Sequence, residues 1–110
     1  MHHEQTRIYT TALDVVSDAA AVIRELPVGY GFLADQLRRA ASSVVLNFSE
    51  GSKHTSRRER RRYFTMAAGS ATEVSAVVDV AKRFGVIDTA LGAALKDRCA
   101  HVCAMLRLYR

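Results

Sequence analysis

The sequence has 110 residues, of which 49% are hydrophobic and 25% charged, and its formal net charge is +5. This length fits one domain with a core of its own, and the composition excludes a disordered tail. No apolar run approaches the roughly 20 residues that span a bilayer, and the first ten residues are polar, so we expect neither membrane insertion nor a secretory signal.

Apolar residues recur every three or four positions in the first half of the chain, which predicts two amphipathic helices. The first covers residues 5–26 and ends at Pro27, which cannot continue a helix. The second covers residues 32–51, with Gly51 placed to cap its C-terminus. The predicted core faces are Tyr9, Leu13, Val16, Ala20, Ile23 and Leu26 in the first helix, and Leu33, Leu37, Ala40 or Ala41, Val44 and Phe48 in the second.

The second half of the chain predicts two further helices with clear start and stop signals. Ser56 and Glu59 form a capping-box pattern at the start of a helix over residues 56–84, which Gly85 closes. Asp88 caps a fourth helix over residues 88–108. Their predicted core faces are Tyr63 or Phe64, Ala67, Ala71, Val74, Val77 or Val78, Ala81 and Phe84, and then Leu91, Leu95, Cys99, Val102, Leu106 and Tyr109.

No segment alternates between apolar and polar residues as a strand does, and the connections between the predicted helices are short. The fold class is therefore all-α, an antiparallel up-down-up-down four-helix bundle that occupies residues 1–110 as one domain. Small residues cluster around Gly69, whose place inside a helix costs about 1 kcal/mol relative to alanine. Close packing within the bundle and a contact between subunits both explain this cluster.

The positive charge is concentrated in one short segment. Residues 52–62 carry six basic residues and one acid, Glu59, a net charge of +5 that equals the charge of the whole chain. Like charges three or four residues apart on a helix repel each other, whereas guanidinium groups fit phosphate oxygens. A nucleic-acid backbone, an acidic protein surface, an anionic lipid and a merely solvated helix end all remain possible. The candidate contacts are Lys53, Arg57, Arg58, Arg60, Arg61 and Arg62, with Arg38 and Arg39 as a potential extension.

The sequence gives little support for catalysis or metal binding. Cys99 and Cys103 lie four residues apart on a predicted helix, which favours two reduced thiols in a cytoplasmic protein over a disulfide or a zinc site. The histidines have no catalytic or metal-binding spacing. Because Gly29-Tyr30-Gly31 lacks a third glycine, it is not a dinucleotide loop. We expect a protein that is not an enzyme and uses no cofactor or metal.

Three motifs resemble one bacterial family of four-helix bundles. They are Gln36-Leu37-Arg38-Arg39-Ala40-Ala41, Asn47-Phe48-Ser49-Glu50-Gly51-Ser52 and Ala68-Gly69-Ser70-Ala71-Thr72-Glu73. The family comprises proteins encoded in 23S rRNA intervening sequences, together with the accessory variability determinant of diversity-generating retroelements. The resemblance extends from about Tyr9 to Leu108, although Val45 stands where the family often has proline.

The resemblance implies more than the residue pattern does. Family members form homopentamers, and the retroelement members bind nucleic acid and a reverse transcriptase through basic surfaces. Asn47, Glu50 and Gly51 occupy motif positions that we interpret as structural. The leading hypothesis is a non-enzymatic, oligomeric bundle that binds phosphates of RNA or DNA through its arginine-rich helix start. The alternative is a scaffold that docks an acidic protein partner such as a reverse transcriptase or another polymerase.

Overall fold

Residues 3–109 form four helices in the computed structural model, which describes this part of the chain. The helices are α1 (His3–Glu25), α2 (Gly31–Ser52), α3 (Arg57–Phe84) and α4 (Thr89–Tyr109). Each predicted helix range agrees with these bounds to within two residues. Met1, His2 and Arg110, which end the predicted 1–110 domain, lie outside the described residues.

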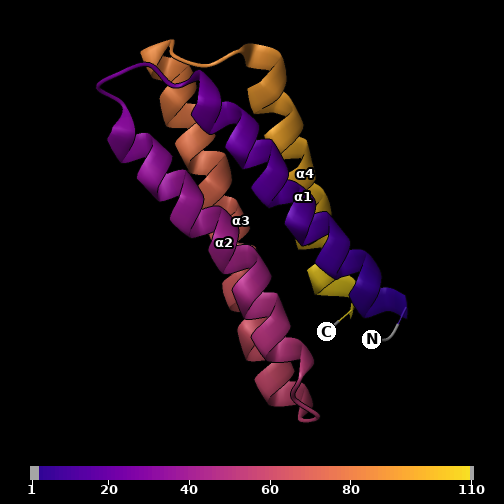
Figure 1. The fold of residues 1–110 in the computed structure, drawn as a ribbon. Coiled ribbons are helices and arrows are strands. Elements are labelled where there is room, and N and C mark those ends of the chain that lie inside the picture. The colour runs from indigo at the N-terminus through magenta and orange to yellow at the C-terminus, as the bar shows by residue number, and fades with distance from the viewer. Residues whose placement is uncertain (1–2, 110) are drawn as a thin grey trace.

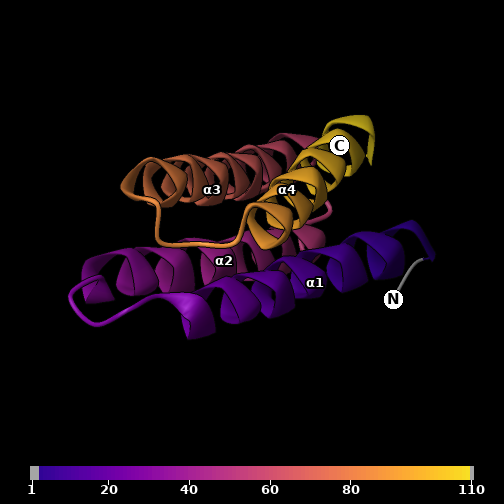
Figure 2. The same cartoon turned by 90° about the horizontal axis from the view of Figure 1, so that it is seen from above.

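Consecutive helices run in opposite directions, as Figure 1 shows. α1 packs against α2 and α4, and α3 packs against the same two helices. Seen from above, α1 and α2 form one layer and α3 and α4 the other (Figure 2). The molecule measures 45 × 21 × 18 Å. The predicted all-α bundle with up-down-up-down topology is therefore confirmed. The described residues contain no strand, and none of their helices is long and apolar enough to cross a membrane.

Three of the predicted helix caps are present. The hydroxyl of Ser56 accepts a hydrogen bond from the backbone N–H of Glu59 at 3.3 Å. The predicted capping box is only half formed, because the Glu59 carboxylate accepts from Arg62 and not from the backbone N–H of Ser56. A carboxylate oxygen of Asp88 accepts from the backbone N–H of Leu91 at 3.0 Å, so both helix starts have a donor satisfied by a side chain. Gly85 ends α3 in the left-handed conformation, with φ of 71°, which glycine adopts without steric cost.

The predicted role of Gly51 as a C-terminal cap is wrong. Gly51 is buried inside α2, which continues to Ser52, and the capping residue is Lys53 in a right-handed conformation. A Cβ atom at position 51 would lie only 2.9 Å from two ring carbons of Phe64 and from Cβ of Tyr63. The glycine is therefore needed for the close approach of α2 and α3, and not for a change in backbone direction.

The core face of α1 also differs from the prediction, by one residue in register. The buried residues are Ile8, Ala12, Val15, Ala19 and Val22, whereas Leu13 is 41% exposed. Because α1 carries apolar residues over a wide arc, the sequence spacing fits two neighbouring stripes equally well. The stripe with two alanines faces the core, where small side chains let α1 approach its neighbours, and the larger Tyr9, Val16 and Ile23 pack at its edge.

The predicted core faces of α2, α3 and α4 are largely confirmed. Phe48 of α2 and Phe64 of α3 are fully buried and stack with their ring centroids 5.2 Å apart. Phe84 is the exception, because it lies one turn beyond Ala81, the last buried residue of α3, and is 54% exposed. Cys99 fills part of the core as a small apolar side chain.

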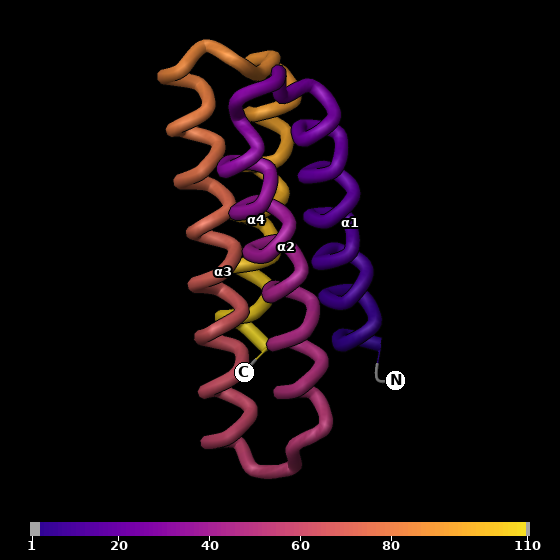
Figure 3. The backbone as a smooth tube through the Cα atoms, turned by 60° about the vertical axis from the view of Figure 1, so that its left-hand side comes forward, coloured from indigo at the N-terminus to yellow at the C-terminus, as the bar shows by residue number. Residues whose placement is uncertain are grey.

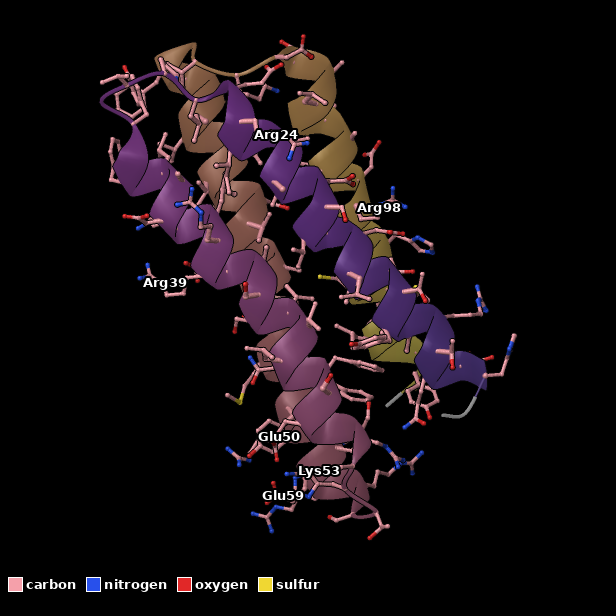
Figure 4. The ribbon with its side chains drawn as sticks, in the orientation of Figure 1. Arg24, Arg39, Glu50, Lys53, Glu59 and Arg98 are labelled. Atoms are coloured by element: carbon pink, nitrogen blue, oxygen red, sulfur yellow. The ribbon has the colours of Figure 1, made fainter. Side chains whose placement is uncertain are left out.

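Polar contacts tie the helices together outside the core. Arg98 of α4 donates to Asp18 of α1 at 3.1 Å and lies 3.6 Å from Asp14 (Figure 4). On the opposite side, Lys96 of α4 bonds to Asp79 of α3 at 2.6 Å. These ion pairs are partly exposed, and solvent screens their charges, so each contributes little to stability.

Candidate nucleic-acid interface

The connection between α2 and α3 projects beyond the other two helices. Figure 3 shows this turn extending past the first turn of α1 and the last turn of α4. No residue from 52 through 63 is buried, whereas Gly51 and Phe64 on either side are. This end of the molecule is therefore a helical hairpin that is anchored to the bundle at Gly51 and Phe64. We call its six basic residues the basic tip: Lys53, Arg57, Arg58, Arg60, Arg61 and Arg62.

Four of the five arginines of the basic tip line one open groove on α3. Arg57, Arg58, Arg61 and Arg62 surround a volume of 660 Å³, whose lining is completed by Thr65 and Met66. Because these arginines occupy adjacent turns of one helix, their charges share a surface. Arg60 does not line the groove, and its Nε atom is buried without a hydrogen-bond partner.

Only one groove arginine is paired with a carboxylate. Arg62 donates from Nε to Glu59 at 3.1 Å, and this hydrogen bond raises the pKa of its guanidinium. Its Nη2 donates to the Tyr63 hydroxyl at 3.1 Å, and its central carbon lies 4.6 Å from the centre of the Tyr63 ring. Arg57, Arg58 and Arg61 form no ion pair with any described residue. The groove therefore carries a strong uncompensated positive charge.

Lys53 contributes less free charge than the arginines. Its ammonium group lies 2.8 Å from the carboxylate of Glu50, and the hydrogen bond between them lowers the pKa of Glu50 and raises that of Lys53. The His54 ring stacks on the Tyr63 ring, with centroids 5.3 Å apart, and its Nε2 lies 3.6 Å from the same carboxylate. Glu50 thus connects the end of α2 to the turn.

Arg38 and Arg39 do not join the basic tip. They precede Lys53 by about four turns of α2, which places them roughly 20 Å away along the helix axis. Arg38 pairs with Asp35 at 3.2 Å, and Arg39 is exposed. Figure 4 shows Glu50, Lys53 and Glu59 gathered at the tip, with Arg39 far along the helix.

Of the other predicted motif residues, Asn47 lies along the contact between α2 and α3, and Gly69 does not. The side-chain amide of Asn47 donates to the backbone oxygen of Ser43 at 3.0 Å and to its hydroxyl at 2.8 Å. The Ser70 hydroxyl of α3 donates to the Ser43 hydroxyl at 2.9 Å and completes a link between the helices. Gly69 is exposed, and no atom lies within 4 Å of the place its Cβ would take. Close packing within the bundle is therefore the wrong explanation for Gly69.

The thiols show no features of a reactive or metal-binding pair. Cys99 and Cys103 are free, Cys99 is buried, and burial raises its pKa from 9.0 to about 11. Burial also raises the pKa of the half-buried Cys103. Within residues 3–109, no group of three or more histidine, cysteine, aspartate or glutamate side chains could hold a metal ion.

Sequence reasoning missed the ring contacts at both ends of the molecule. His54 and Tyr63 at the basic tip, and Tyr30, Phe32 and Phe84 at the other end, come from different helices or turns. A signal was available, because an antiparallel bundle places the start of its second helix beside the end of its third. Aromatic residues at both of those positions are therefore neighbours.

Comparisons with known proteins agree with the fold. The comparison with curated proteins gave no match. A crystal structure of a protein of unknown function from the S23 ribosomal protein family of Bacteroides thetaiotaomicron VPI-5482 superimposes with a TM-score of 0.81. The alignment covers 90% of this chain and 94% of that one at 15% identity, so it shows the fold alone. The sequence model of the 23S rRNA-intervening sequence protein family matches residues 4–108. With nearly the whole chain matched, the protein belongs to the family of 23S rRNA-intervening sequence proteins.

Proposed function

We propose that the protein is a non-enzymatic, cytoplasmic bundle that binds the phosphate backbone of RNA or DNA through its basic tip. The observation that carries this proposal is the groove of Arg57, Arg58, Arg61 and Arg62 on a projecting hairpin. Guanidinium groups bind phosphate oxygens through two parallel hydrogen bonds, and binding releases counterions condensed on the polyanion. Three of these four groups have no carboxylate partner within the described chain, so they are free to bind.

The folding of the tip does not account for its charge. Arg57 and Arg61, and likewise Arg58 and Arg62, lie four residues apart, where like charges destabilise a helix by about 0.2–0.5 kcal/mol per pair. No buried side chain in residues 52–63 anchors the segment. The arginines of the tip weaken their own helix and make no ion pair with described residues apart from Arg62 with Glu59, so an external anion explains them better.

We further propose that the bundle works as a homo-oligomer, a pentamer by resemblance to the family. The outer surface of α3 supports an assembly, because Gly69 and Ala76 have little or no side chain there and Met66 exposes an apolar side chain. Glycine in a helix interior with open space beside it lets another backbone approach closely. Assembly would multiply the number of basic tips presented to one polyanion, which raises avidity without any new contact.

Binding is tested by fluorescence anisotropy with a structured RNA and a DNA duplex of matched length, across a salt series. The binding variant removes the groove, and the control variant removes the same amount of charge from four exposed arginines elsewhere that form no ion pair with described residues. The substitutions to alanine are Arg57, Arg58, Arg61 and Arg62 in the first variant, and Arg7, Arg24, Arg39 and Arg107 in the second.

We expect the groove variant to lose most of its affinity and the control variant to keep it. On duplex DNA, each lost phosphate contact makes the slope of log K against log salt shallower by roughly 0.9. Losing four contacts should therefore make the slope shallower by about 3 to 4. Equal weakening in both variants would show that net charge alone drives binding. If neither nucleic acid binds the wild type at low salt, the proposal fails, and docking of an acidic protein partner becomes the better account of the tip.

Assembly is tested separately by light scattering on the purified chain. A pentamer has five times the 12.1 kDa mass of the chain, about 60 kDa. Replacing Gly69 with arginine should reduce this mass if the outer surface of α3 is the contact. The matched control is Ser49→Arg, at an exposed position of α2. A wild type that stays monomeric at all concentrations would refute assembly.

A further inference from the structure

At the end of the molecule opposite the basic tip, three aromatic rings meet on the surface. The ring of Tyr30, which precedes α2, lies 6.0 Å from Phe32 of α2 and 5.5 Å from Phe84 of α3, and the two phenylalanine rings are 6.3 Å apart. Phe32 is 52% exposed and Phe84 54% exposed. With Val80, one turn before Phe84 and 43% exposed, these residues form what we call the aromatic pole.

The core does not require this cluster. Leu33, which follows Phe32, and Ala81, one turn before Phe84, are buried and fill the core at this end of the bundle. Isolated exposed apolar residues are common on protein surfaces and have no special meaning. Here, however, apolar side chains from two helices touch each other and form one patch, and a contiguous patch of this kind marks an interaction surface.

An open groove adjoins the rings along the last turns of α3. It has a volume of 590 Å³ and is lined by Asp79, Val80, Lys82, Arg83 and Phe84. Asp79 is already paired with Lys96 of α4 at 2.6 Å. Lys82 and Arg83 form no ion pair with described residues, although both help to lower the pKa of Asp79, so the groove presents two cations beside an apolar patch.

We propose that the aromatic pole and its groove form a docking site for an acidic amphipathic helix of a partner protein. The apolar side of such a helix covers Phe32, Phe84 and Val80, and its carboxylates pair with Lys82 and Arg83. Amphipathic helices bind grooves in this way: apolar side chains three or four residues apart enter the groove, and charged side chains pair at its rim. The complementary charge fixes the orientation of the helix and excludes basic segments.

Two other occupants fit the pole less well. A nucleic acid needs flat ring faces for its bases, whereas the two edge-to-face contacts of Phe84 engage the rings with each other. A second copy of the chain needs about 800 Å² on each partner for a stable interface. About half of Phe32 and half of Phe84 are exposed, and together with Val80 they offer only roughly 300 Å² of apolar surface. That area suits one helix of a partner.

The proposal does not rest on the function proposed for the basic tip. The two surfaces lie at opposite ends of α3, which spans nearly the whole length of the molecule (Figure 1). Phe84 and Arg62 are 22 residues apart on that helix, or about 33 Å. A protein with both surfaces occupied would therefore hold a polyanion at one end and a protein helix at the other.

The test uses a fluorescein-labelled synthetic 14-residue helix, with leucines on one side and glutamates on the other, titrated with the full chain. We expect wild-type protein to bind it in the micromolar range, and the Phe32→Ser/Phe84→Ser variant to bind at least about tenfold more weakly. Both substituted residues are about half exposed, so the variant should fold, which circular dichroism checks. The tip variant lacking Arg57, Arg58, Arg61 and Arg62 should bind the peptide as wild type does, which separates the two surfaces.

Charge reversal gives a second, independent readout. The Lys82→Glu/Arg83→Glu variant should bind the glutamate peptide more weakly than wild type does. It should bind the same peptide more tightly when lysines replace the glutamates. Binding weaker than about 1 mM to wild type, or equal binding by the phenylalanine variant, would overturn the proposal. It would also be overturned if that variant instead dissociated an oligomer in light scattering, since the pole would then be a contact between copies. Competition for the pole by single-stranded RNA would assign it to nucleic acid.

Discussion

At the scale of single residues, Gly51 sets how closely α2 and α3 approach. The buried Phe64 ring beside it cannot move aside easily, because it stacks between Phe48 and Tyr109. We expect Gly51→Ala to lower the free energy of unfolding by about 1–3 kcal/mol through overpacking, even though alanine is the better helix former. Urea denaturation at equal protein concentration measures this loss.

The matched control for that experiment is Gly69→Ala. This glycine is also inside a helix, but a Cβ atom there meets nothing within 4 Å. In the monomer, at a protein concentration where light scattering shows no assembly, its replacement should raise the free energy of unfolding by up to about 1 kcal/mol, the difference in helix propensity. If the two substitutions had effects of the same sign, steric crowding at Gly51 would not be the cause.

The two cysteines should be unreactive while the protein is folded. A thiol reacts as the thiolate, and burial raises the pKa of Cys99 to about 11 and also raises that of Cys103. We expect slow modification by a thiol reagent at pH 8, and rapid modification of both thiols in urea. A Cys99→Ala variant isolates the reaction of Cys103. Fast modification of the native protein would contradict the burial of these thiols.

The same shift in pKa predicts how stability depends on alkaline pH. The folded state keeps Cys99 protonated, and its pKa rises from 9.0 to about 11, so the contribution of this thiol is fully present below pH 9. Above that pH the unfolded chain ionises first and gains stability relative to the folded state. Denaturation midpoints should therefore fall between about pH 9 and pH 11, and less so in the Cys99→Ala variant.

At the scale of secondary-structure elements, the start of α3 depends on a single side-chain cap. The Ser56 hydroxyl satisfies the N–H of Glu59, while the Glu59 carboxylate binds Arg62. We expect Ser56→Ala to cost about 1 kcal/mol of stability, and Ser56→Asp, which keeps an acceptor, to restore most of it. Thermal unfolding measures the change.

Ser49 provides the control for this prediction. It is exposed in the last turn of α2, and its side chain makes no hydrogen bond with any described residue. Ser49→Ala should leave stability unchanged or raise it slightly, because alanine is the better helix former. If Ser56→Ala behaved in the same way, the hydroxyl of Ser56 would not be acting as a cap.

At the scale of the whole molecule, packing is uneven along the bundle axis. The middle holds fully buried valines such as Val44 and Val74, whereas residues 52–63 contain no buried side chain. A segment with little buried apolar surface opens locally at low free energy. We expect backbone amides near the basic tip to exchange with deuterium much faster than those near Val44 or Val74.

Hydrogen exchange also connects this packing gradient to the proposed function. A polyanion that binds the basic tip should slow exchange in the first turns of α3 and leave the opposite end unchanged. Mass spectrometry of peptides covering residues 52–66 and 80–92 measures both regions at once. Uniform exchange along α2 and α3 in the free protein would show that the projecting hairpin is as well anchored as the middle.

The sequence by itself determined the number, order and limits of the helices. Each of these depends on local chemistry: Pro27 and Gly85 stop a helix, and Ser56 and Asp88 start one, whatever packs around them. The segregation of positive charge into residues 52–62 was equally visible, because counting charges requires no structure. The short turns then left the antiparallel bundle as the natural topology, and the structure agrees.

Only the tertiary structure decided which surfaces face each other. The register of α1 was ambiguous in sequence because two neighbouring apolar stripes fit the same helical period, and contact with α2 and α4 selected the stripe through Ala12 and Ala19. Gly51 is needed because of Phe64, which is distant in sequence. The hydrogen bond from Ser70 of α3 to Ser43 of α2 likewise depends on where the two helices lie in space. Distances between elements are a property of packing, and a local pattern carries no record of them.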